Sequence, residues 1–567
     1  MPPKRSKTGT SVLKTNKKAK TIAEEGEQLK ESLVLSISSI QNLSQEITSE
    51  SKYNNFVLLL EQLQQVGTQL LLKPTENLES ESLGRQLALV LYKCFQTLAK
   101  EGRLTIRKNQ DQKEKLVTKW LLDKLQSFKS NIVEILTYNY QHELSLQLDL
   151  LEIYLNLLKM ENLHIFIDKQ FPVDSFTGLI TALFENQNGK ILPDGLSDNY
   201  LILEFADTMA KYWDLQYYFF HALSGFLETQ KLSKTKMELQ VFVSKFLTII
   251  KDGLLFNEKG TELENQPTWI PKDNLPSVVY KHNQFKSLFQ KCILTIFSYP
   301  LLPSQYKATL LILHKRIIPY MAKPQSLMDF LTDSYDIQDD LIVPILALNS
   351  LYELIKTYNI EYPDFYTKLY SLLKPELLYT RYRSRFFRLC DLFLSSTHLS
   401  ASLVASFIKK LARLSLTASA PGVVIVIPFI YNLLKRHPTC MVMLHNTTTN
   451  DESDDDKNGY KDPFDALEAN PLATNAINSS LWEMETLMSH YHPNIATLAK
   501  IFGEPFRKPS YNMEDFLDWN YQSLLETEKS RKYKNQATAL EYEEFDNVLS
   551  NNDIDGQKRV LLEGWTI

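Results

Sequence analysis

The sequence predicts an all-α protein built as an α-solenoid, in which antiparallel helix pairs stack one on another. Glycine supplies only 16 of the 567 residues, under half of its usual share of about 7%. Apolar residues recur at helical spacing in strings separated by short breaks, and the alternation typical of strands is hard to find. A chain of this length fits a repeat body, whose size is not limited by a single core.

An N-terminal helical repeat region is expected over residues 22–251. Its clearest helix carries leucines at steps of four and three along one face, namely Leu144, Leu148, Leu151, Leu155 and Leu158. Further helices are predicted over Phe56–Leu72, Tyr200–Trp213 and Tyr217–Thr229. The aromatic run Tyr217–Phe220 is interpreted as core, where such runs usually lie.

Residues 252–276 hold two glycines and three prolines, which predicts a linker or long loop between two helical regions. A C-terminal helical repeat region follows over residues 277–445, with helices expected over 285–299, 303–321, 340–358 and 375–395 among others. Helix pairs at intervals of about 40 residues resemble HEAT repeats. The fold class is therefore an α-solenoid of HEAT-like pairs.

The composition changes abruptly after His445. Residues 446–461 are polar and acidic and are predicted to be a disordered surface insert. Ordered sequence is expected again over residues 462–548, including a helix over Leu472–Ser489. Residues 549–567 form a polar C-terminal tail.

The run Leu414–Leu434 has no charged residue, so a membrane span, a strand and a buried helix compete for it. Its length just reaches the roughly 20 residues that a bilayer requires. Pro421 and Gly422 break it near the start and Pro428 interrupts the rest, and basic residues flank both ends. These features favour a broken helix buried in protein.

Charge and cysteine content limit the function classes. The net charge is −5, so any contact with nucleic acid must come from local patches. The four cysteines, Cys94, Cys292, Cys390 and Cys440, are far apart and suit a reducing compartment. Nucleotide-binding, hydrolase and zinc-protease motifs are missing from the sequence. We therefore expect no enzyme, no cofactor, no small-molecule substrate and no membrane partner.

The first twenty residues contain seven basic residues and no acidic one. Lys4 and Arg5 precede Lys17, Lys18 and Lys20 in the arrangement of a two-part nuclear import signal. Residues 1–21 are therefore predicted to be a disordered basic tail that directs the chain to the nucleus. A merely solvated tail is the alternative, and such a tail can also touch RNA phosphates weakly.

A metal site is considered at His437, Cys440 and His445, with His490 and His492 further on. The first two side chains lie one helical turn apart, but the set fits no familiar zinc framework. Structural histidines are favoured, and no metal is expected.

The segment TRYRSRFFRLC is the strongest basic cluster. On a helix, Arg381, Arg385 and Arg388 form one cationic stripe, while Arg383 falls outside it. Such a stripe can contact phosphate or an acidic partner segment. The alternative is a solvated face that pairs with neighbouring carboxylates.

From Tyr379 onward the chain resembles a known family in three runs: RYRSRFFRLCDLF, APGVVIVIPFIYNLLKRHPTC and DPFDALEANPLATNAINSSLWEMETL. They are similar to the nucleolar complex protein four family, part of the wider CCAAT-binding-factor-type nucleolar family. The resemblance implies a non-catalytic, HEAT-like scaffold in the nucleolus. It also implies a role in the small-subunit processome, the 90S pre-ribosome, with 18S rRNA processing and 40S assembly and export.

The resemblance further implies that the partner is nucleolar protein fourteen, together with other processome proteins. Partner binding is associated with the residues that match the family's shared segment, and these are Pro428, Phe429, Tyr431, Asn432, Leu433, Leu434, Arg436, His437 and Pro438, with Asp462, Pro463 and Phe464. Trp482 is added as a candidate contact. Aromatic and basic residues of this kind are typical of binding hot spots, but Phe429, Tyr431 and Trp482 can equally close the end of the solenoid core.

Three functions remain open from the sequence. The first is the scaffold described above, with any contact to pre-ribosomal RNA indirect. The second is a module that binds pre-rRNA directly through the basic tail and Arg381–Arg388. The third is a helical-repeat transport adaptor, which the chain's own import signal disfavours.

Overall fold

The computed structural model describes most of the chain. The described residues are 36–72, 78–106, 111–140, 143–166, 170–186, 188–230, 235–252, 263–337, 340–358, 364–445, 462–530, 550–552 and 558–560. The basic tail 1–21, the acidic insert 446–461 and most of the C-terminal tail lie outside them, so the predictions made for those segments are untested.

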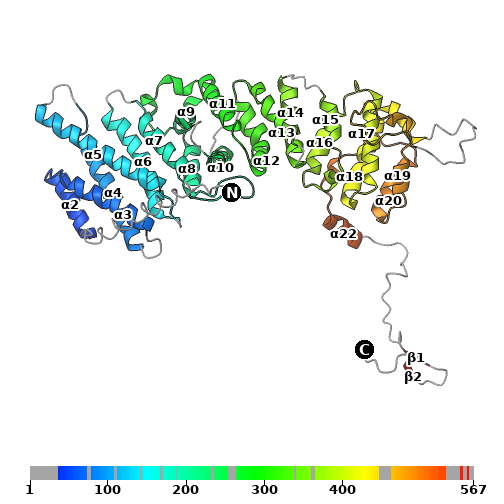
Figure 1. Cartoon of the computed structure of the whole chain (residues 1–567), viewed down its shortest axis with the longest axis horizontal. Coiled ribbons are helices and arrows are strands. Elements are labelled where there is room, and N and C mark those ends of the chain that lie inside the picture. The colour runs from blue at the N-terminus through cyan, green and yellow to red at the C-terminus, as the bar shows by residue number, and fades with distance from the viewer. Residues whose placement is uncertain are drawn as a thin grey trace, which may run out of the picture. The chain divides into compact units, whose positions relative to one another are not determined.

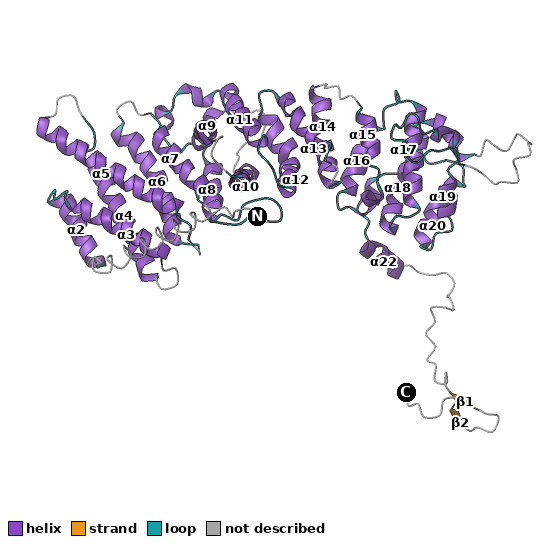
Figure 2. Ribbon diagram, in the orientation of Figure 1, coloured by secondary structure: helices purple, strands orange, loops and turns teal. Residues whose placement is uncertain are grey.

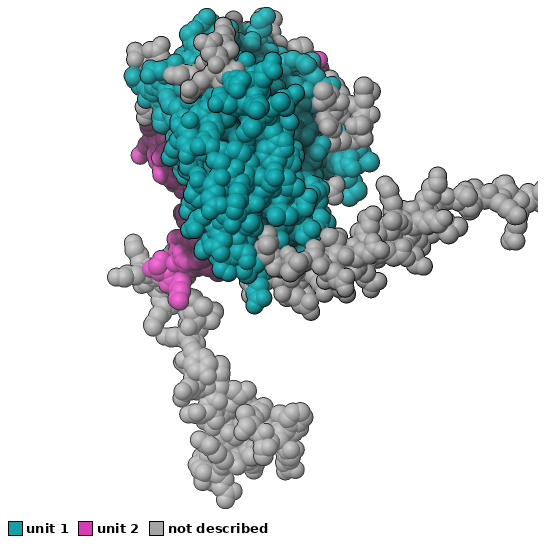
Figure 3. Space-filling view, turned by 90° about the vertical axis from the view of Figure 1, so that its left-hand side faces the viewer, with its two compact units in different colours: residues 1–363 teal, residues 364–567 magenta. Residues whose placement is uncertain are grey.

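The chain divides into two compact units, Met1–Pro363 and Asp364–Ile567, which Figure 3 colours teal and magenta. The sequence placed the division at 252–276 instead. Compositional breaks mark where regular helix stops, but packing decides whether the segment separates two bodies. Each unit is described below by itself.

Unit 1 contains thirteen α-helices in its described part (Figure 1). They are α2 (Ile37–Ser49), α3 (Asn55–Leu72), α4 (Leu78–Lys100), α5 (Gln112–Thr137), α6 (Ser145–Met160), α7 (Val173–Glu185), α8 (Tyr200–Lys211), α9 (Trp213–Gln230), α10 (Lys236–Asp252), α11 (His282–Phe297), α12 (Pro303–Ile312), α13 (Met328–Tyr335) and α14 (Ile342–Tyr358). Short 3-10 segments lie at Leu263–Asn265, Lys272–Asn274, Ser277–Tyr280, Ile318–Tyr320 and Pro324–Leu327, and π-helical turns at Glu161–Ile165 and Leu313–Ile317.

These helices stack in two layers. Helices α4, α6, α8, α10, α12 and α14 pack in succession along one layer, and α3, α5, α7, α9 and α11 along the other. Successive helices alternate between the layers, so each consecutive pair forms a hairpin, as in helical-repeat proteins. This arrangement confirms the predicted α-solenoid, and purple helices dominate Figure 2.

Local sequence signals explain individual helices. Asp111 and Asn199 cap α5 and α8 by accepting hydrogen bonds from the first free backbone amides. Along α5, Leu121, Leu125 and Phe128 are buried at helical spacing against the neighbouring helices. The aromatic run Tyr217–Phe220 is buried in α9, as the sequence predicted.

The described part of the predicted linker, residues 263–276, packs inside unit 1. The buried Asp214 carboxylate of α9 accepts hydrogen bonds from the backbone amides of Trp269 (2.8 Å) and Ile270 (2.9 Å). The Trp269 indole donates to the carbonyl of Leu155 in α6 at 2.9 Å. Burial raises the pKa of Asp214, and four backbone amides, those of Trp269, Ile270, Leu215 and Asp214 itself, oppose that rise. The segment is therefore fastened across α6 and α9.

The helix predicted over 303–321 is interrupted. Helix α12 ends at Ile312, a π-helical turn covers Leu313–Ile317, and a 3-10 turn covers Ile318–Tyr320. Pro319 lies in that last turn, and proline has no amide to continue an α-helix. Pro319 therefore cannot continue the α-helical hydrogen bonding beyond this point.

Unit 2 contains shorter elements. Its α-helices are α15 (Phe365–Ser371), α16 (Arg383–Phe393), α17 (Ala401–Ser415), α18 (Ala420–Arg436), α19 (Trp482–Leu487), α20 (Pro493–Ala499), α21 (Glu514–Leu517) and α22 (Tyr521–Ser530). 3-10 helices cover Pro375–Tyr379, Pro438–Leu444, Ala476–Asn478 and Lys500–Phe502. Strands β1 (Ser550–Asn552) and β2 (Lys558–Val560) pair antiparallel, Ser550 opposite Val560, which the all-α prediction does not include.

Two helices predicted in unit 2 are wrong in extent. Residues 375–395 form a 3-10 turn followed by the shorter α16, because Thr380 to Tyr382 turn the chain between them. Residues 472–489 are mostly turns, and only Trp482–Leu487 is α-helical. Asn475 adopts a left-handed backbone conformation with φ 56°, which ends any right-handed helix at that point.

Candidate protein-binding surface of the C-terminal unit

The charge-free run Leu414–Leu434 contains the most deeply buried helix of unit 2. Every residue of α18 from Ala420 to Leu434 is buried. Pro421 lies in its first turn, where a missing amide costs nothing, and Pro428 lies inside the helix. The structure confirms that the element is helical and buried, but the predicted interruption at Pro428 is wrong, because α18 continues through it to Arg436. No helix in the described part of the chain is long and apolar enough to span a bilayer.

A C-terminal segment covers one side of α18. The Tyr431 hydroxyl donates to the carbonyl of Lys508 at 2.7 Å. Asn432 donates to the carbonyl of Tyr511 at 2.8 Å and accepts from the Tyr511 amide at 2.7 Å. The Tyr431 ring also contacts Phe506, with 4.5 Å between ring centroids. Tyr431 and Asn432, both predicted partner contacts, are thus occupied by contacts within the chain.

The end of α18 is fixed by two further contacts. Arg436 binds both carboxylate oxygens of Asp391 in α16, at 2.6 and 3.1 Å, a bidentate geometry that guanidinium groups favour. The buried His437 ring nitrogen Nε2 lies 2.8 Å from the carbonyl of Leu394. Pro438 then opens the following 3-10 helix and is exposed. Of the predicted residues at this end, Pro438 is the one available to a partner without rearrangement.

A buried ion network connects α17 to the segment that begins at Asp462. The Lys409 side chain is 0% exposed, and its Nζ lies 3.0 Å from Asp462 Oδ2 and 2.7 Å from Glu483 Oε1. Arg413, one turn further along α17, lies 2.5 Å from Asp462 and 2.7 Å from Glu483. Two cations therefore face two carboxylates, and the four charges compensate one another inside the protein.

Trp482 is part of the same network. Its indole donates to Asp462 Oδ2 at 3.1 Å, and the Arg413 guanidinium carbon lies 4.6 Å from its ring centroid, a cation–π distance. Burial would raise the pKa of Asp462, but hydrogen bonds from Ser479, Phe464, Trp482 and Lys409 outweigh it and hold that pKa well below its ordinary value. Burial raises the pKa of Glu483. Asp462 and Trp482, predicted as partner contacts, hold the fold together.

A loop with exposed leucines projects from this anchored segment. The Asp462 carboxylate accepts a hydrogen bond from the backbone amide of the buried Phe464, and Pro463 between them is half-buried. The loop then runs through residues 465–472. Leu467 is 95% exposed and Leu472 is 57% exposed. Side-chain oxygens of Asp465 and Asn470 accept from the backbone amides of these two leucines, at 2.9 and 3.0 Å. Large apolar side chains on a fixed backbone are suited to contact another protein.

The loop is tied to α17, and so is the 3-10 helix that follows α18. The Ser406 hydroxyl of α17 lies 2.6 Å from the Thr474 hydroxyl, and the Cys440 thiol donates to the carbonyl of Ala401, the first residue of α17. The 3-10 helix adds Val442, which is 49% exposed. We name Pro438, Val442, Leu467 and Leu472 the apolar surface of unit 2.

The histidines and cysteine considered for a metal do not form a site. In the described residues, no group of three or more His, Cys, Asp or Glu side chains is arranged to hold a metal ion. His437 and Cys440 instead contact backbone carbonyls, and burial raises the pKa of the Cys440 thiol. Both side chains therefore have partners within the fold, and the absence of a metal stays a prediction.

The predicted cationic stripe is only partly formed. Arg381 lies before α16 and is exposed, whereas Arg388 forms a bidentate ion pair with Glu514 at 2.8 and 2.6 Å. Arg385 is half-buried, and its buried Nη1 has no hydrogen-bond partner in the described part of the chain. Arg388 therefore pairs with a carboxylate, as the alternative interpretation of the basic cluster predicted. Phosphate binding by Arg381 and Arg385 stays a prediction.

Sequence reasoning missed Lys409, Glu483 and the two loop leucines. One signal was available: Ser406, Lys409 and Arg413 follow one another at steps of three and four along a largely apolar helix. This spacing predicts a polar stripe on a buried face, which needs charged partners. Nothing in the sequence indicated which carboxylates supply them.

Antiparallel helix pairs stacked in two layers define the class of this molecule, a helical-repeat protein. Comparisons with known proteins agree. Residues 344–499 match the CBF/Mak21 family, and residues 30–232 match the family model "Nucleolar complex protein 4-like, TPR repeats".

Similar proteins occur in fungi and animals. The chain is 43% identical over 554 residues to nucleolar complex protein 4 of Saccharomyces cerevisiae, covering 93% of this chain and 98% of the relative. It is 32% identical to homolog B of Xenopus laevis, covering 75% and 77%, and 33% identical to the Mus musculus homolog, covering 66% and 70%. The chain belongs to the nucleolar complex protein 4 family. It is a nucleolar protein with a role in ribosome biogenesis, and the family is not one of known enzymes.

Proposed function

We propose that this chain is a non-catalytic assembly factor of the small ribosomal subunit. It acts within the small-subunit processome in 18S rRNA processing and in 40S assembly and export, in complex with nucleolar protein fourteen. Membership of the family supports the nucleolar setting. The partner and the step are expectations from the resemblance between the C-terminal sequence and that family.

The observation that carries the proposal is the apolar surface of unit 2. Leu467 is 95% exposed and Leu472 is 57% exposed. Contact of these apolar side chains with water is unfavourable, so a partner that covers them gains free energy of binding. Hydrogen bonds to their amides fix the loop before binding, so little conformational entropy is lost when a partner docks. The partner contacts Pro438, Val442 and the two leucines.

Depletion of the protein is expected to reduce mature 18S rRNA several-fold while the large-subunit rRNAs fall later and less. Re-expression of the wild-type chain restores 18S rRNA. The double variant Leu467→Asp/Leu472→Asp fails to restore it, because carboxylates cannot enter an apolar pocket of the partner without a large desolvation cost. Northern blots of pre-rRNA and mature rRNA measure the outcome.

The matched control is Leu525→Asp, which places the same change on another exposed leucine, at 70% exposure in α22, and is expected to restore 18S rRNA. Normal 18S rRNA together with selective loss of the large subunit on depletion would overturn the proposed role. Full rescue by the double variant would show that Leu467 and Leu472 are not needed for the proposed role.

A further inference from the structure

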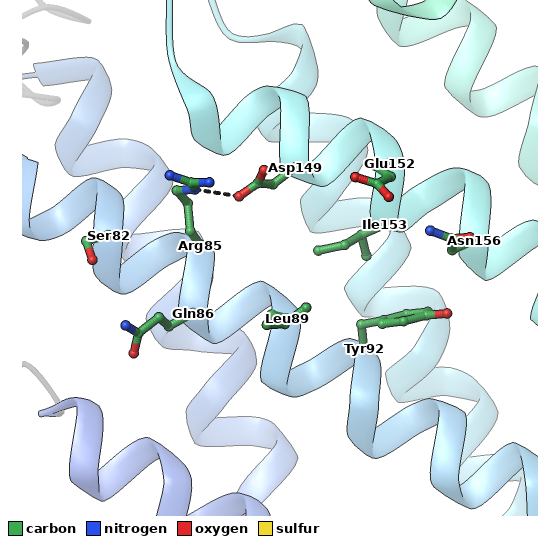
Figure 4. Close-up of a pocket in the computed structure, with 9 residues that line it drawn as sticks. All are labelled: Ser82, Arg85, Gln86, Leu89, Tyr92, Asp149, Glu152, Ile153 and Asn156. Atoms are coloured by element: carbon green, nitrogen blue, oxygen red, sulfur yellow. Dashed lines mark hydrogen bonds and ion pairs between the residues drawn. The ribbon is translucent and has the colours of Figure 1, made fainter. Parts of the chain in front are cut away.

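A groove opens between α4 and α6 of unit 1, far in sequence from the apolar surface of unit 2 (Figure 4). Its volume is about 510 Å³, and residues that line it include Arg85, Leu89 and Tyr92 from α4 and Asp149, Glu152 and Ile153 from α6. Grooves of roughly 300–1,000 Å³ are the size in which proteins hold small ligands or a few side chains of a peptide. No function assigned above uses this groove.

The middle of the groove is apolar. Leu89 is 44% exposed, although it lies between two packed helices, and Ile153 is 7% exposed on the facing side. The Tyr92 ring extends the apolar area, and its hydroxyl accepts a hydrogen bond from Gln96 at 3.3 Å. Apolar side chains of a ligand can cover this area, and their removal from water favours binding.

The charges of the groove are unbalanced. Arg85 Nε pairs with Asp149 Oδ2 at 2.5 Å, which Figure 4 marks as a dashed line. Glu152 lies one turn further along α6 and is exposed, and it forms no ion pair with any residue in the described parts of the chain. Burial raises the pKa of Tyr92, and the neighbouring Glu152 charge raises it further. One arginine against two carboxylates leaves the groove with a net negative charge.

The groove is formed before any ligand binds. Gly84 of α4 is so close to its neighbours that an added Cβ would lie 3.1 Å from Leu146 of α6 and 3.0 Å from Val66 of α3. The Glu81 carboxylate also accepts a hydrogen bond from the Leu146 amide, at 3.3 Å. These contacts hold the two helices together at one end, so a ligand meets a rigid groove and loses little affinity to rearrangement.

We propose that the α4–α6 groove docks a basic amphipathic segment of a partner protein. The segment places an apolar side chain, such as leucine or isoleucine, against Leu89 and Ile153. It places a lysine or arginine beside Glu152, where the opposite charge is available. The negative charge of the groove disfavours nucleic acid as the occupant. The inference does not depend on the proposed function, because it rests on unit 1 alone.

The test uses random short peptides displayed on phage and selected on the purified full-length chain. Enriched peptides are expected to share an apolar residue followed or preceded by lysine or arginine at helical or alternating spacing. Affinity of a labelled enriched peptide, measured by fluorescence anisotropy, should fall about tenfold or more in Glu152→Lys and again in Leu89→Glu. Both positions are exposed, so the variants are expected to melt like the wild-type chain.

Matched controls are Glu79→Lys, on α4 outside the groove, and Leu58→Glu, on exposed α3 surface. Both should bind the peptide as the wild type does. Selection of acidic peptides, or equal binding by Glu152→Lys and the wild type, would overturn the proposal. If a synthetic peptide of residues 1–20 binds the groove more tightly than every selected peptide, the occupant is the chain's own tail and the proposed partner is wrong. Either failure leaves the test of 18S rRNA unaffected.

Discussion

Replacing Lys409 with methionine is expected to increase amide hydrogen exchange across α17 and α19 by at least about a hundredfold. Methionine is unbranched like lysine and nearly as long, but it has no charge, so the fully buried Glu483 and the neighbouring Asp462 lose their central cation. Removing one partner of a buried ion pair typically costs about 3–5 kcal/mol, and each 1.4 kcal/mol is about tenfold in an equilibrium constant. Exchange measured by mass spectrometry reports this locally.

A second substitution separates the orphaned charge from the lost packing. In the double variant Lys409→Met/Glu483→Gln, one carboxylate is neutral, so exchange in α17 should be slower than in Lys409→Met alone. Lys500→Met changes an exposed lysine of the same unit and is expected to shift stability by at most about 0.5 kcal/mol. Exchange within twofold of wild type in Lys409→Met would show that the network does not hold α17 to the Asp462 segment.

Replacing Asn432 with leucine is expected to detach residues 506–528 from α18 while α17 stays protected. Asn432 is 1% exposed and is the partner of both the amide and the carbonyl of Tyr511. Leucine has a similar volume and can make neither bond, and each buried backbone group left unpaired costs about 1–3 kcal/mol. Hydrogen exchange in peptides covering α21 and α22 should rise by tenfold or more, because these helices follow the lost anchor directly.

The control is Asn478→Leu, since Asn478 is exposed in the 3-10 helix Ala476–Asn478. Its exchange pattern is expected to match the wild type. Equal loss of protection in α17 and in residues 506–528 of Asn432→Leu would mean that the two parts unfold together, and that the C-terminal segment is not a separately anchored cover.

The sequence predicted the parts of the fold that follow from local chemistry. Low glycine content and helical periodicity predict the two-layered α-solenoid, and Pro421 and Pro428 in a charge-free run predict a buried α18. These signals need only neighbours along the chain, so one sequence reveals them. The same reasoning overextended helices where a single residue changes the backbone, as Pro319 and the left-handed Asn475 do.

The candidate site was less predictable because its contacts join distant residues. Lys409 and Glu483 are 74 residues apart, and Asn432 and Tyr511 are 79 apart. Spacing along one helix cannot reveal such pairs, and tertiary packing decides which polar residues are internal. For this reason the sequence predicted partner contacts at residues that the structure shows making contacts within the fold, namely Tyr431, Asn432, Asp462 and Trp482. The exposed Leu467 was not among the predicted contacts.

Co-purification with nucleolar protein fourteen tests the central claim most directly. The tagged full-length chain, its Leu467→Asp/Leu472→Asp variant and its Leu525→Asp variant are purified from nuclear extract under equal conditions, and the partner is quantified by mass spectrometry. We expect near-stoichiometric partner with the wild type and with Leu525→Asp, and at least a tenfold loss with the double variant. Wild-type chain that carries no nucleolar protein fourteen, or a double variant that carries as much as the wild type, would contradict the proposed complex or its surface.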